Sequence, residues 1–210
     1  MEKLQNFINN EFVPPGGGEY LENMNPGTGE VLNEVAASTE EDAVKAIDAA
    51  DSAFKSWSKT TINERAHYLR KIAEAIYNER ETLALAETQD NGKPLVVSKA
   101  VDIPRAQENF KFFADAITQN KGEFFQQDSQ TIHYTHRRPL GAVSCISPWN
   151  LPLYLLSWKI APAIATGNTV VAKPSEVTPY TAYLLSKILK QVDLPAGVVN
   201  ILHGLSLIHI

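Results

Sequence analysis

The run Gly141-Ala142-Val143-Ser144-Cys145-Ile146 is short and largely apolar, as a buried β-strand is. Two further runs of this kind follow, at Thr169–Ala172 and Val198–Leu202. Between the three runs, Leu153–Thr166 and Pro179–Val192 carry helical patterns. The order strand, helix, strand, helix, strand predicts parallel strands joined by right-handed helical crossovers. The second half of the chain is therefore predicted to hold the first units of a doubly wound α/β domain.

The N-terminal region is predicted to begin with short strands and tight turns. Strands are expected near Asn6–Val13 and Glu19–Met24, joined in a hairpin by the loop Pro14–Gly18. A second turn cluster at Asn25–Gly29 precedes a predicted strand at Val31–Ala36.

Three helices are expected next. Thr39 begins the first, because its side chain can cap free N–H groups and three acidic residues follow it. Thr61 begins the second, which is predicted to run to about Thr88 and to stop at Gly92. The third is expected over about Val96–Thr118, where Pro104 either kinks the helix or marks its true start.

Composition excludes several classes of protein. The chain has 210 residues, 44% apolar, and a net charge of −5 with the signs interspersed, which argues against nucleic acid as a partner. Met1–Gln5 has no apolar core of a secretory signal, and the apolar stretch Leu151–Ala165 is too short and too interrupted to cross a bilayer. Cys145 is the single cysteine, which excludes an internal disulfide and a cysteine-rich metal site and fits a cytoplasmic location. His203 and His209 have no ligand partner in the pattern, so no metal site is predicted.

Asn150 follows the first predicted strand directly and precedes a helix whose first turn contains Pro152. A turn or cap residue is the plain interpretation, because Asn supplies a local acceptor at such positions. The functional interpretation uses the side-chain NH₂ group, which can donate to a carbonyl oxygen as that oxygen becomes an oxyanion.

Lys173 ends the second predicted strand and precedes Pro174, which favours an extended backbone at the lysine. A solvated lysine at a strand end is one interpretation, and Glu176 can be a plain first-turn acid of the next helix. The alternative is a cation and a carboxylate at the mouth of a parallel sheet, where ligands bind. Such a pair can hydrogen-bond the ribose hydroxyls of a nucleotide.

Four motifs carry a resemblance to a known family: Ser147–Leu153, Ala172–Glu176, Asp90–Pro94 and Leu194–Asn200. With these motifs the chain resembles the aldehyde dehydrogenase superfamily over nearly all of residues 5–202. Three further runs look closest to the branch that acts on 2-aminomuconic semialdehyde: Val101–Arg105, Asn109–Ala114 and Trp149–Leu156.

The resemblance implies a role for each matching residue. Asn150 would be the side-chain half of an oxyanion hole, and Arg105 would bind a substrate carboxylate with its guanidinium fork. An ion pair of Arg105 with Asp102 or Glu108 on the helix surface is the alternative. The implied cofactor is NAD, with Glu176 disfavouring the 2′-phosphate of NADP. The residues implied to bind NAD are Ile146, Ser147, Pro148, Trp149, Lys173, Ser175 and Glu176.

The predicted organisation follows from the pattern and the resemblance together. Residues 1–119 are expected to form the N-terminal helical and hairpin part of the cofactor-binding domain. Residues 120–140 are expected to form an oligomerisation hairpin, which implies a homo-oligomer for the full-length family. Residues 141–202 form the first βαβαβ units of the NAD-binding domain, an incomplete Rossmann-like parallel sheet. Residues 203–210 depart from the family pattern and are expected to be a foreign or disordered tail. The predicted strand Val198–Leu202 is expected to be an unprotected edge of the sheet.

The family reaction also needs a cysteine nucleophile and a glutamate base, which in the family lie beyond position 210. Cys145 is rejected as a substitute, because it lies inside a predicted buried strand with nothing to lower its pKa. The chain is therefore expected to be a truncated semialdehyde dehydrogenase, inactive alone. One alternative is a fragment of a broad-specificity or retinal-type aldehyde dehydrogenase, and another is a non-catalytic fragment that assembles with full-length subunits.

Overall fold

A computed structural model describes residues 1–205 of the chain. The strands, in chain order, are β1 (Lys3–Leu4), β2 (Asn6–Ile8), β3 (Glu11–Val13), β4 (Tyr20–Asn25), β5 (Glu30–Ala36), β6 (Phe124–Gln126), β7 (Ile132–Tyr134), β8 (Ala142–Ile146), β9 (Thr169–Lys173) and β10 (Val199–Ile201). The helices are α1 (Glu40–Trp57), α2 (Ile62–Asn78), α3 (Arg80–Asn91), α4 (Leu95–Val97), α5 (Ile103–Thr118), α6 (Pro152–Ala165) and α7 (Tyr180–Gln191).

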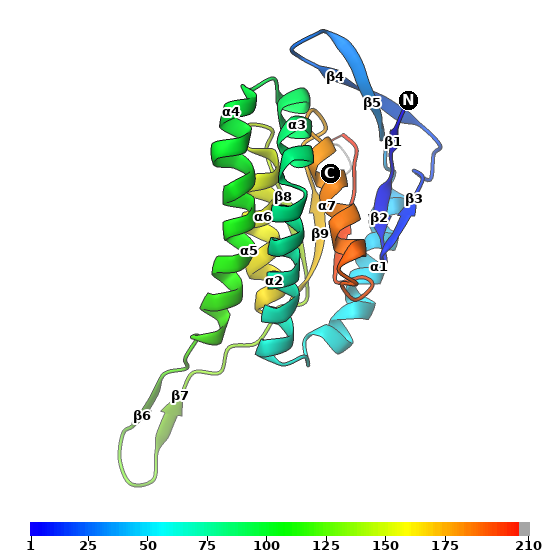
Figure 1. The fold of residues 1–210 in the computed structure, drawn as a ribbon. Coiled ribbons are helices and arrows are strands. Elements are labelled where there is room, and N and C mark those ends of the chain that lie inside the picture. The colour runs from blue at the N-terminus through cyan, green and yellow to red at the C-terminus, as the bar shows by residue number, and fades with distance from the viewer. Residues whose placement is uncertain (206–210) are drawn as a thin grey trace.

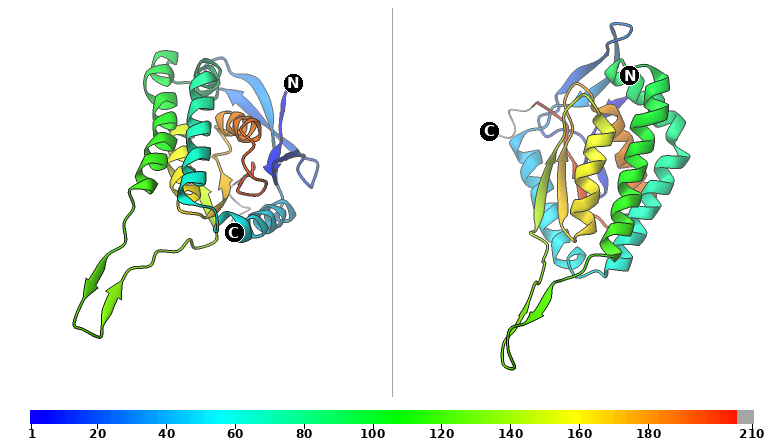
Figure 2. Two further views of the ribbon diagram at one scale, coloured as in Figure 1. Left: turned by 60° about the horizontal axis from the view of Figure 1, so that its bottom comes forward. Right: turned by 90° about the vertical axis from the view of Figure 1, so that its left-hand side faces the viewer.

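A five-stranded sheet in the order β3-β2-β10-β9-β8 organises the molecule. The strands β8, β9 and β10 are parallel, as the βαβαβ pattern predicts, and α6 and α7 are the crossovers between them. The helix α1 lies on one face of the sheet, and α6, with α5 and α2 beyond it, lies on the other (Figures 1 and 2). The α/β fold class is confirmed.

The main hydrophobic core lies between the sheet and the large helical layer. Leu69 and Ile76 of α2, Phe110 of α5 and Ile160 of α6 are all fully buried there. All three helices thus contribute apolar side chains to this layer. Burial of such side chains is the main stabilising contribution to this layer.

The expectation that Val198–Leu202 is an unprotected edge strand is wrong. The antiparallel strand β2 covers it, with Phe7 opposite Ile201, so the edges of the sheet are β3 and β8. The pairing joins segments from opposite ends of the chain, which no local sequence pattern reveals.

The predicted N-terminal hairpin is also wrong. The run Asn6–Val13 is two strands rather than one, because Asn9 and Asn10 both adopt positive φ and form the tight turn between β2 and β3. The loop Pro14–Gly18 joins β3 to β4, which belongs to a separate three-stranded sheet in the order β1-β5-β4.

The predicted helices are found, with two differences at their bounds. The run from Thr61 to Thr88 is interrupted at Glu79 and forms α2 and α3. A π-helical turn over Ser98–Asp102 connects α4 to α5, and Pro104 lies in the first turn of α5, where a missing N–H does no harm. The end of α3 at the left-handed Gly92 is confirmed.

The helix starts follow the predicted capping chemistry. The Thr61 side chain accepts from the Glu64 N–H, and the Glu64 carboxylate accepts from the Thr61 N–H. The Asp42 carboxylate accepts from the Thr39 N–H at the start of α1 and from the Gly16 N–H in the preceding loop. These bonds fix where α1 and α2 begin.

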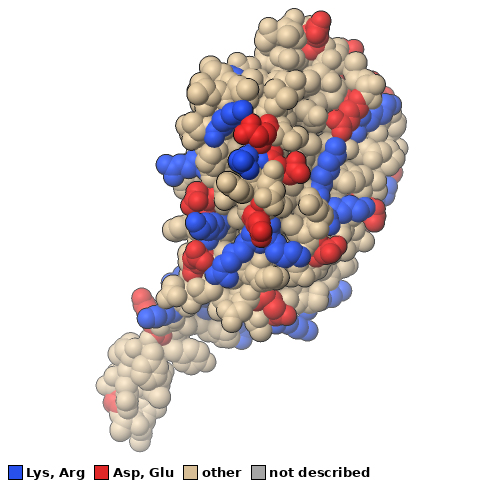
Figure 3. Space-filling model, viewed as in Figure 1, with Lys and Arg blue, Asp and Glu red and all other residues tan. Residues whose placement is uncertain are grey.

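The two-stranded hairpin β6–β7 projects from the body of the molecule, and all six of its strand residues are exposed (Figure 1). On the face drawn in Figure 3, charges of both signs are interspersed over the body, while the hairpin shows few charged side chains.

Part of the predicted tail is packed into the body. His203 is buried, its N–H donates to the Asn6 side chain, and its carbonyl accepts from the Ser38 N–H. The rest of that prediction, residues 206–210 with His209, lies outside the described residues.

Candidate functional site

The two sequence motifs meet at the carboxyl ends of neighbouring strands. In the parallel register of β8 and β9, Ile146 lies opposite Lys173, and the Ser147 N–H donates to the Lys173 carbonyl over 3.1 Å. The predicted cofactor-binding residues after each strand are thereby brought side by side. This edge of a parallel sheet is where ligands bind in doubly wound folds.

Lys173 and Glu176 form an ion pair, with 3.1 Å between the ammonium and the carboxylate. The ammonium-bearing side chain is 5% exposed and that of Glu176 is 33% exposed. A hydrogen bond from its own backbone N–H, and then the Lys173 ammonium, lower the pKa of Glu176. The pair therefore presents one ionised acceptor and one cationic donor.

A cleft of about 510 Å³ opens beside this pair. It lies between α1 and the β8–β9–β10 part of the sheet, and Ile146, Val171 and Ile47 give it largely apolar walls. Lys173 supplies the one charged side chain of its lining among the described residues. An apolar cleft with a few convergent polar groups suits a small-molecule ligand.

The turn after β8 exposes the candidate oxyanion donor. Asn150 is exposed, and within residues 1–205 its side-chain amide makes no hydrogen bond. Leu151, not Asn150, is the residue before α6, and no side chain caps that helix. The interpretation of Asn150 as a helix cap is therefore not supported, and its amide is available to a ligand.

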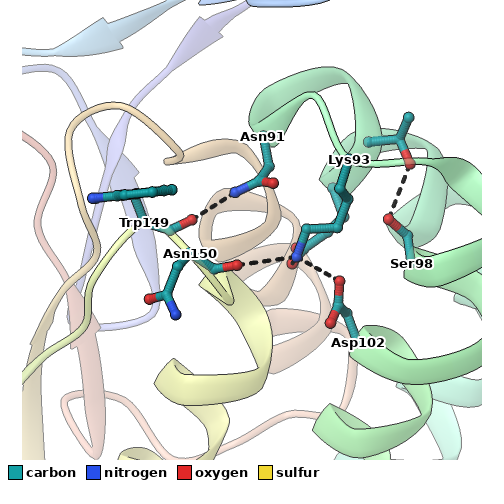
Figure 4. Close-up of polar contacts among 8 residues, drawn as sticks. Asn91, Lys93, Ser98, Asp102, Trp149 and Asn150 are labelled. Carbon is teal, nitrogen blue, oxygen red and sulfur yellow. Dashed lines mark hydrogen bonds and ion pairs between the residues drawn. The ribbon is translucent and has the colours of Figure 1, made fainter.

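The backbone of this turn is held by the turn that follows α3. The Asn91 amide donates to the Trp149 carbonyl over 2.7 Å, and the Lys93 ammonium donates to the Asn150 carbonyl over 3.1 Å (Figure 4). The Trp149 side chain is 60% exposed, so it does not belong to the core. The sequence pattern predicted only that the helix stops at Gly92. It did not predict that Asn91 and Lys93 contact the turn after β8. The available signal was two polar side chains flanking the cap Gly92.

Arg105 is exposed on α5, one helical turn before Asn109. The Asn109 amide donates to the Tyr154 carbonyl in the first turn of α6, so Arg105 lies on the side of α5 nearest that turn. Neither ion-pair partner suggested for Arg105 is used, because Asp102 pairs with Lys93 and Glu108 with Lys111. In the described part of the chain, the Arg105 guanidinium forms no ion pair.

Cys145 of β8 is 5% exposed, and its side chain belongs to the main hydrophobic core. Burial raises the pKa of its thiol to about 11. A thiolate does not form at neutral pH under these conditions, and this supports rejecting Cys145 as a nucleophile.

Residues 1–205 contain no group of three or more His, Cys, Asp or Glu side chains that could hold a metal ion. Helices in the same range are all too short or too polar to cross a membrane.

Comparison with known proteins gives consistent matches. The model of the aldehyde dehydrogenase family matches residues 12–207. The chain is 46% identical over 202 residues to 2-aminomuconic semialdehyde dehydrogenase of Bos taurus, covering 96% of this chain and 41% of the bovine protein. It is 45% identical to aldehyde dehydrogenase B of Escherichia coli, of which it covers 39%. A solved aldehyde dehydrogenase from Bacillus cereus in complex with NAD+ superposes with a TM-score of 0.94 at 42% identity, over 97% of this chain and 42% of that one. The chain thus spans about two-fifths of the length of these relatives.

Proposed function

Because this chain belongs to the aldehyde dehydrogenase family, we propose that it supplies the oxyanion donor and part of the cofactor site for NAD-dependent oxidation of an aldehyde to a carboxylic acid. One observation carries the proposal: Lys173 lies opposite Ile146 in the β8–β9 register, with Glu176 in contact with the lysine. This pairing supports the proposal, because the residues proposed to bind NAD then lie beside the turn that holds Asn150.

The cofactor proposed for the cleft is NAD, which accepts hydride when bound. The Lys173 ammonium would donate to ribose hydroxyls, and the Glu176 carboxylate would accept from them. The exposed face of Ile146 and the backbone from Ser147 to Trp149 would line the path to the nicotinamide, and Ser175 would lie beside the ribose pair. The lowered pKa of Glu176 keeps a negative charge there, which disfavours a 2′-phosphate and so favours NAD over NADP.

Asn150 is the proposed donor to the aldehyde oxygen. Its amide is exposed and makes no hydrogen bond within the described range, while its carbonyl is held by Lys93. Because its backbone is already held in place, the Asn150 amide need not be reoriented when negative charge develops on the aldehyde oxygen. The attacking thiol cannot be Cys145, so we infer that these 210 residues bind cofactor without oxidising an aldehyde.

Replacing Lys173 with Met is expected to weaken NAD+ binding to the chain by about 10- to 100-fold, because it removes charged hydrogen bonds worth about 1.5–3 kcal/mol. Isothermal titration with NAD+ measures this loss, and the same mixture with an aldehyde should form no NADH. Glu176→Gln, which keeps the side-chain shape, should weaken binding in the same direction. The control is Lys187→Met on α7, which removes a surface ion pair with Glu2 near the N-terminus. Unchanged affinity in both site variants would contradict the proposal.

We propose an acidic semialdehyde as the substrate, as in the relatives named for 2-aminomuconic semialdehyde. Arg105 supports this, because its guanidinium is exposed and uncommitted to an ion pair among the described residues. A broad-specificity aldehyde dehydrogenase is the second candidate, because the identity to aldehyde dehydrogenase B, whose name specifies no particular aldehyde, is nearly equal.

Arg105→Leu distinguishes the two substrate classes. We expect binding of a carboxylate-bearing substrate analogue such as muconate to weaken about tenfold, the loss of one charged hydrogen-bonding partner. Binding of an uncharged aldehyde should not change, and nuclear magnetic resonance titration of both ligands measures the difference. Lys111→Met, at an exposed position further along α5, is the control. Equal effects on the two ligands would favour the broad-specificity candidate.

Assembly with another subunit is proposed for the hairpin β6–β7. The hairpin projects from the body with free strand edges and exposes four large apolar side chains, those of Phe124, Phe125, Ile132 and Tyr134.

We also propose a cytoplasmic location, supported by the single cysteine, whose thiol is free and buried.

A further inference from the structure

The turn at the end of α3 reaches across to the turn that carries Asn150. The left-handed conformation of Gly92, with φ of 80°, lets Asn91 and Lys93 on either side of it approach the same stretch of backbone. Their side chains donate to the two successive carbonyls of Trp149 and Asn150 (Figure 4). Two donors on two neighbouring carbonyls restrain both position and rotation of a turn, whereas one donor restrains position alone.

Lys93 is itself held rigidly. Its ammonium donates to Asp102 over 2.6 Å and lies 3.7 Å from Glu87, and the side chains of both carboxylates are fully buried. The Thr88 and Ser98 hydroxyls, 3.0 Å apart, tie α3 to the π-helical turn that carries Asp102. The ammonium is therefore fixed by two separate elements before it donates to the Asn150 carbonyl.

The cluster places the Lys93 ammonium between two buried carboxyl groups. Burial is the main cause that raises the pKa of Glu87 to about 7, and the Lys93 ammonium opposes that rise. Asp102 makes the shorter contact to Lys93, so it is the principal counter-charge. The third contact of the ammonium, to the Asn150 carbonyl, is not needed to balance charge. Water could hydrogen-bond the exposed Asn150 carbonyl if Lys93 did not. The effect of the Lys93 contact is therefore to order the Trp149–Asn150 turn.

We propose that Asn91 and Lys93 are positioning residues that act as a two-point clamp on the Trp149–Asn150 turn and thereby aim the Asn150 amide. The clamp touches neither substrate nor cofactor. The inference rests on the proposed role of Asn150 as oxyanion donor, and it explains how an exposed side chain on a turn is preorganised for that role.

Backbone ¹⁵N relaxation of the 210-residue chain tests the clamp directly. In the wild type we expect order parameters of about 0.85 at Trp149 and Asn150, and in Lys93→Met values below about 0.6. The Ser147 amide, which is bonded to Lys173 in β9, should stay ordered and serves as an internal reference. Lys93→Arg should restore most of the order, because it retains the charged donor.

Two variants make the test decisive. Lys99 lies in the same π-helical turn as Asp102 and pairs with Glu81 of α3, so Lys99→Met removes a nearby lysine outside the clamp and should leave the Trp149–Asn150 turn ordered. Asn91→Ala removes one donor without leaving a charge unpaired, and it should lower order at Trp149 even where Lys93→Met does not fold. Unchanged order at Trp149 and Asn150 in the folded variants, or an equal loss across the whole chain, would overturn the clamp. Failure of NAD+ to bind would instead count against the proposed function and leave this result intact.

Discussion

Acid is expected to destabilise this chain by about 5 kcal/mol through His203 alone, as pH falls from 6.5 towards 3. His203 is 1% exposed, and neither ring nitrogen has a hydrogen-bond partner among the described residues. Burial, and then the positive charge of Lys173, lower the pKa of its imidazole from 6.5 to about 3.

The direction follows from proton binding. Above pH 6.5 the imidazole is neutral in both folded and unfolded chains, so it contributes no pH dependence. Below pH 6.5 the unfolded chain binds a proton that the folded chain excludes, and the free energy of unfolding falls until pH reaches about 3. Urea denaturation at a series of pH values measures this loss.

His203→Gln isolates the contribution, because glutamine is polar and does not titrate. The variant should lose less stability than the wild type between pH 7 and pH 3, and the difference should approach 5 kcal/mol. The control is His67→Gln, on the exposed side of α2, which retains His203 and should follow the wild-type profile. Matching profiles for His203→Gln and the wild type would show that the folded body does not exclude the proton.

Gly197→Ala is the second change with a large expected effect, a loss of about 2–5 kcal/mol in unfolding free energy. Gly197 precedes β10 and has a φ of 78°, which disfavours any residue with a Cβ atom. An added Cβ would also lie 2.5 Å from the Ala49 carbonyl oxygen and 2.9 Å from the Ala53 Cβ, both on α1. The glycine therefore lets α1 pack closely against the loop that leads into β10.

A matched variant separates the two causes. Gly18 has a similar φ of 72°, but an added Cβ there meets no atom within 4 Å. Gly18→Ala should therefore lower the free energy of unfolding only through the strain of a positive φ, by about 1–2 kcal/mol. Chemical denaturation of both variants gives the difference, which measures the close packing of α1. Equal costs would mean that α1 can move away without loss.

The parallel half of the fold could be predicted from the sequence because its signals are local. Short apolar runs at β8 and β9, separated by helical patterns with recognisable starts and stops, leave few alternatives to parallel strands. The register that places Ile146 opposite Lys173 comes from the structure, because a βαβ unit sets the direction of the strands but not their residue-by-residue pairing. The sequence pattern and the resemblance predicted only that the proposed cofactor-binding residues follow these two strands.

The remaining features depend on contacts between distant segments. Pairing of β2 with β10 has no local signature, so β10 was taken for an edge. The same holds for Lys93, whose role depends on where α3 lies relative to the turn at Asn150, 57 residues later. The error at Asn9 and Asn10 is different: two asparagines that adopt positive φ are a local turn signal, which was overlooked inside an apparently continuous strand.

Insertion of β2 beside β10 constrains how the chain folds during synthesis. The Asn6 side chain accepts a hydrogen bond from the His203 N–H, 197 residues further along the chain. At ribosomal rates of about 5–20 residues per second, β2 and β3 must wait roughly 10 to 40 s for that partner to emerge. During this time the apolar side chain of Phe7 lacks the strand that it lies beside in the sheet, and we expect the nascent chain to bind ribosome-associated chaperones until β10 has emerged.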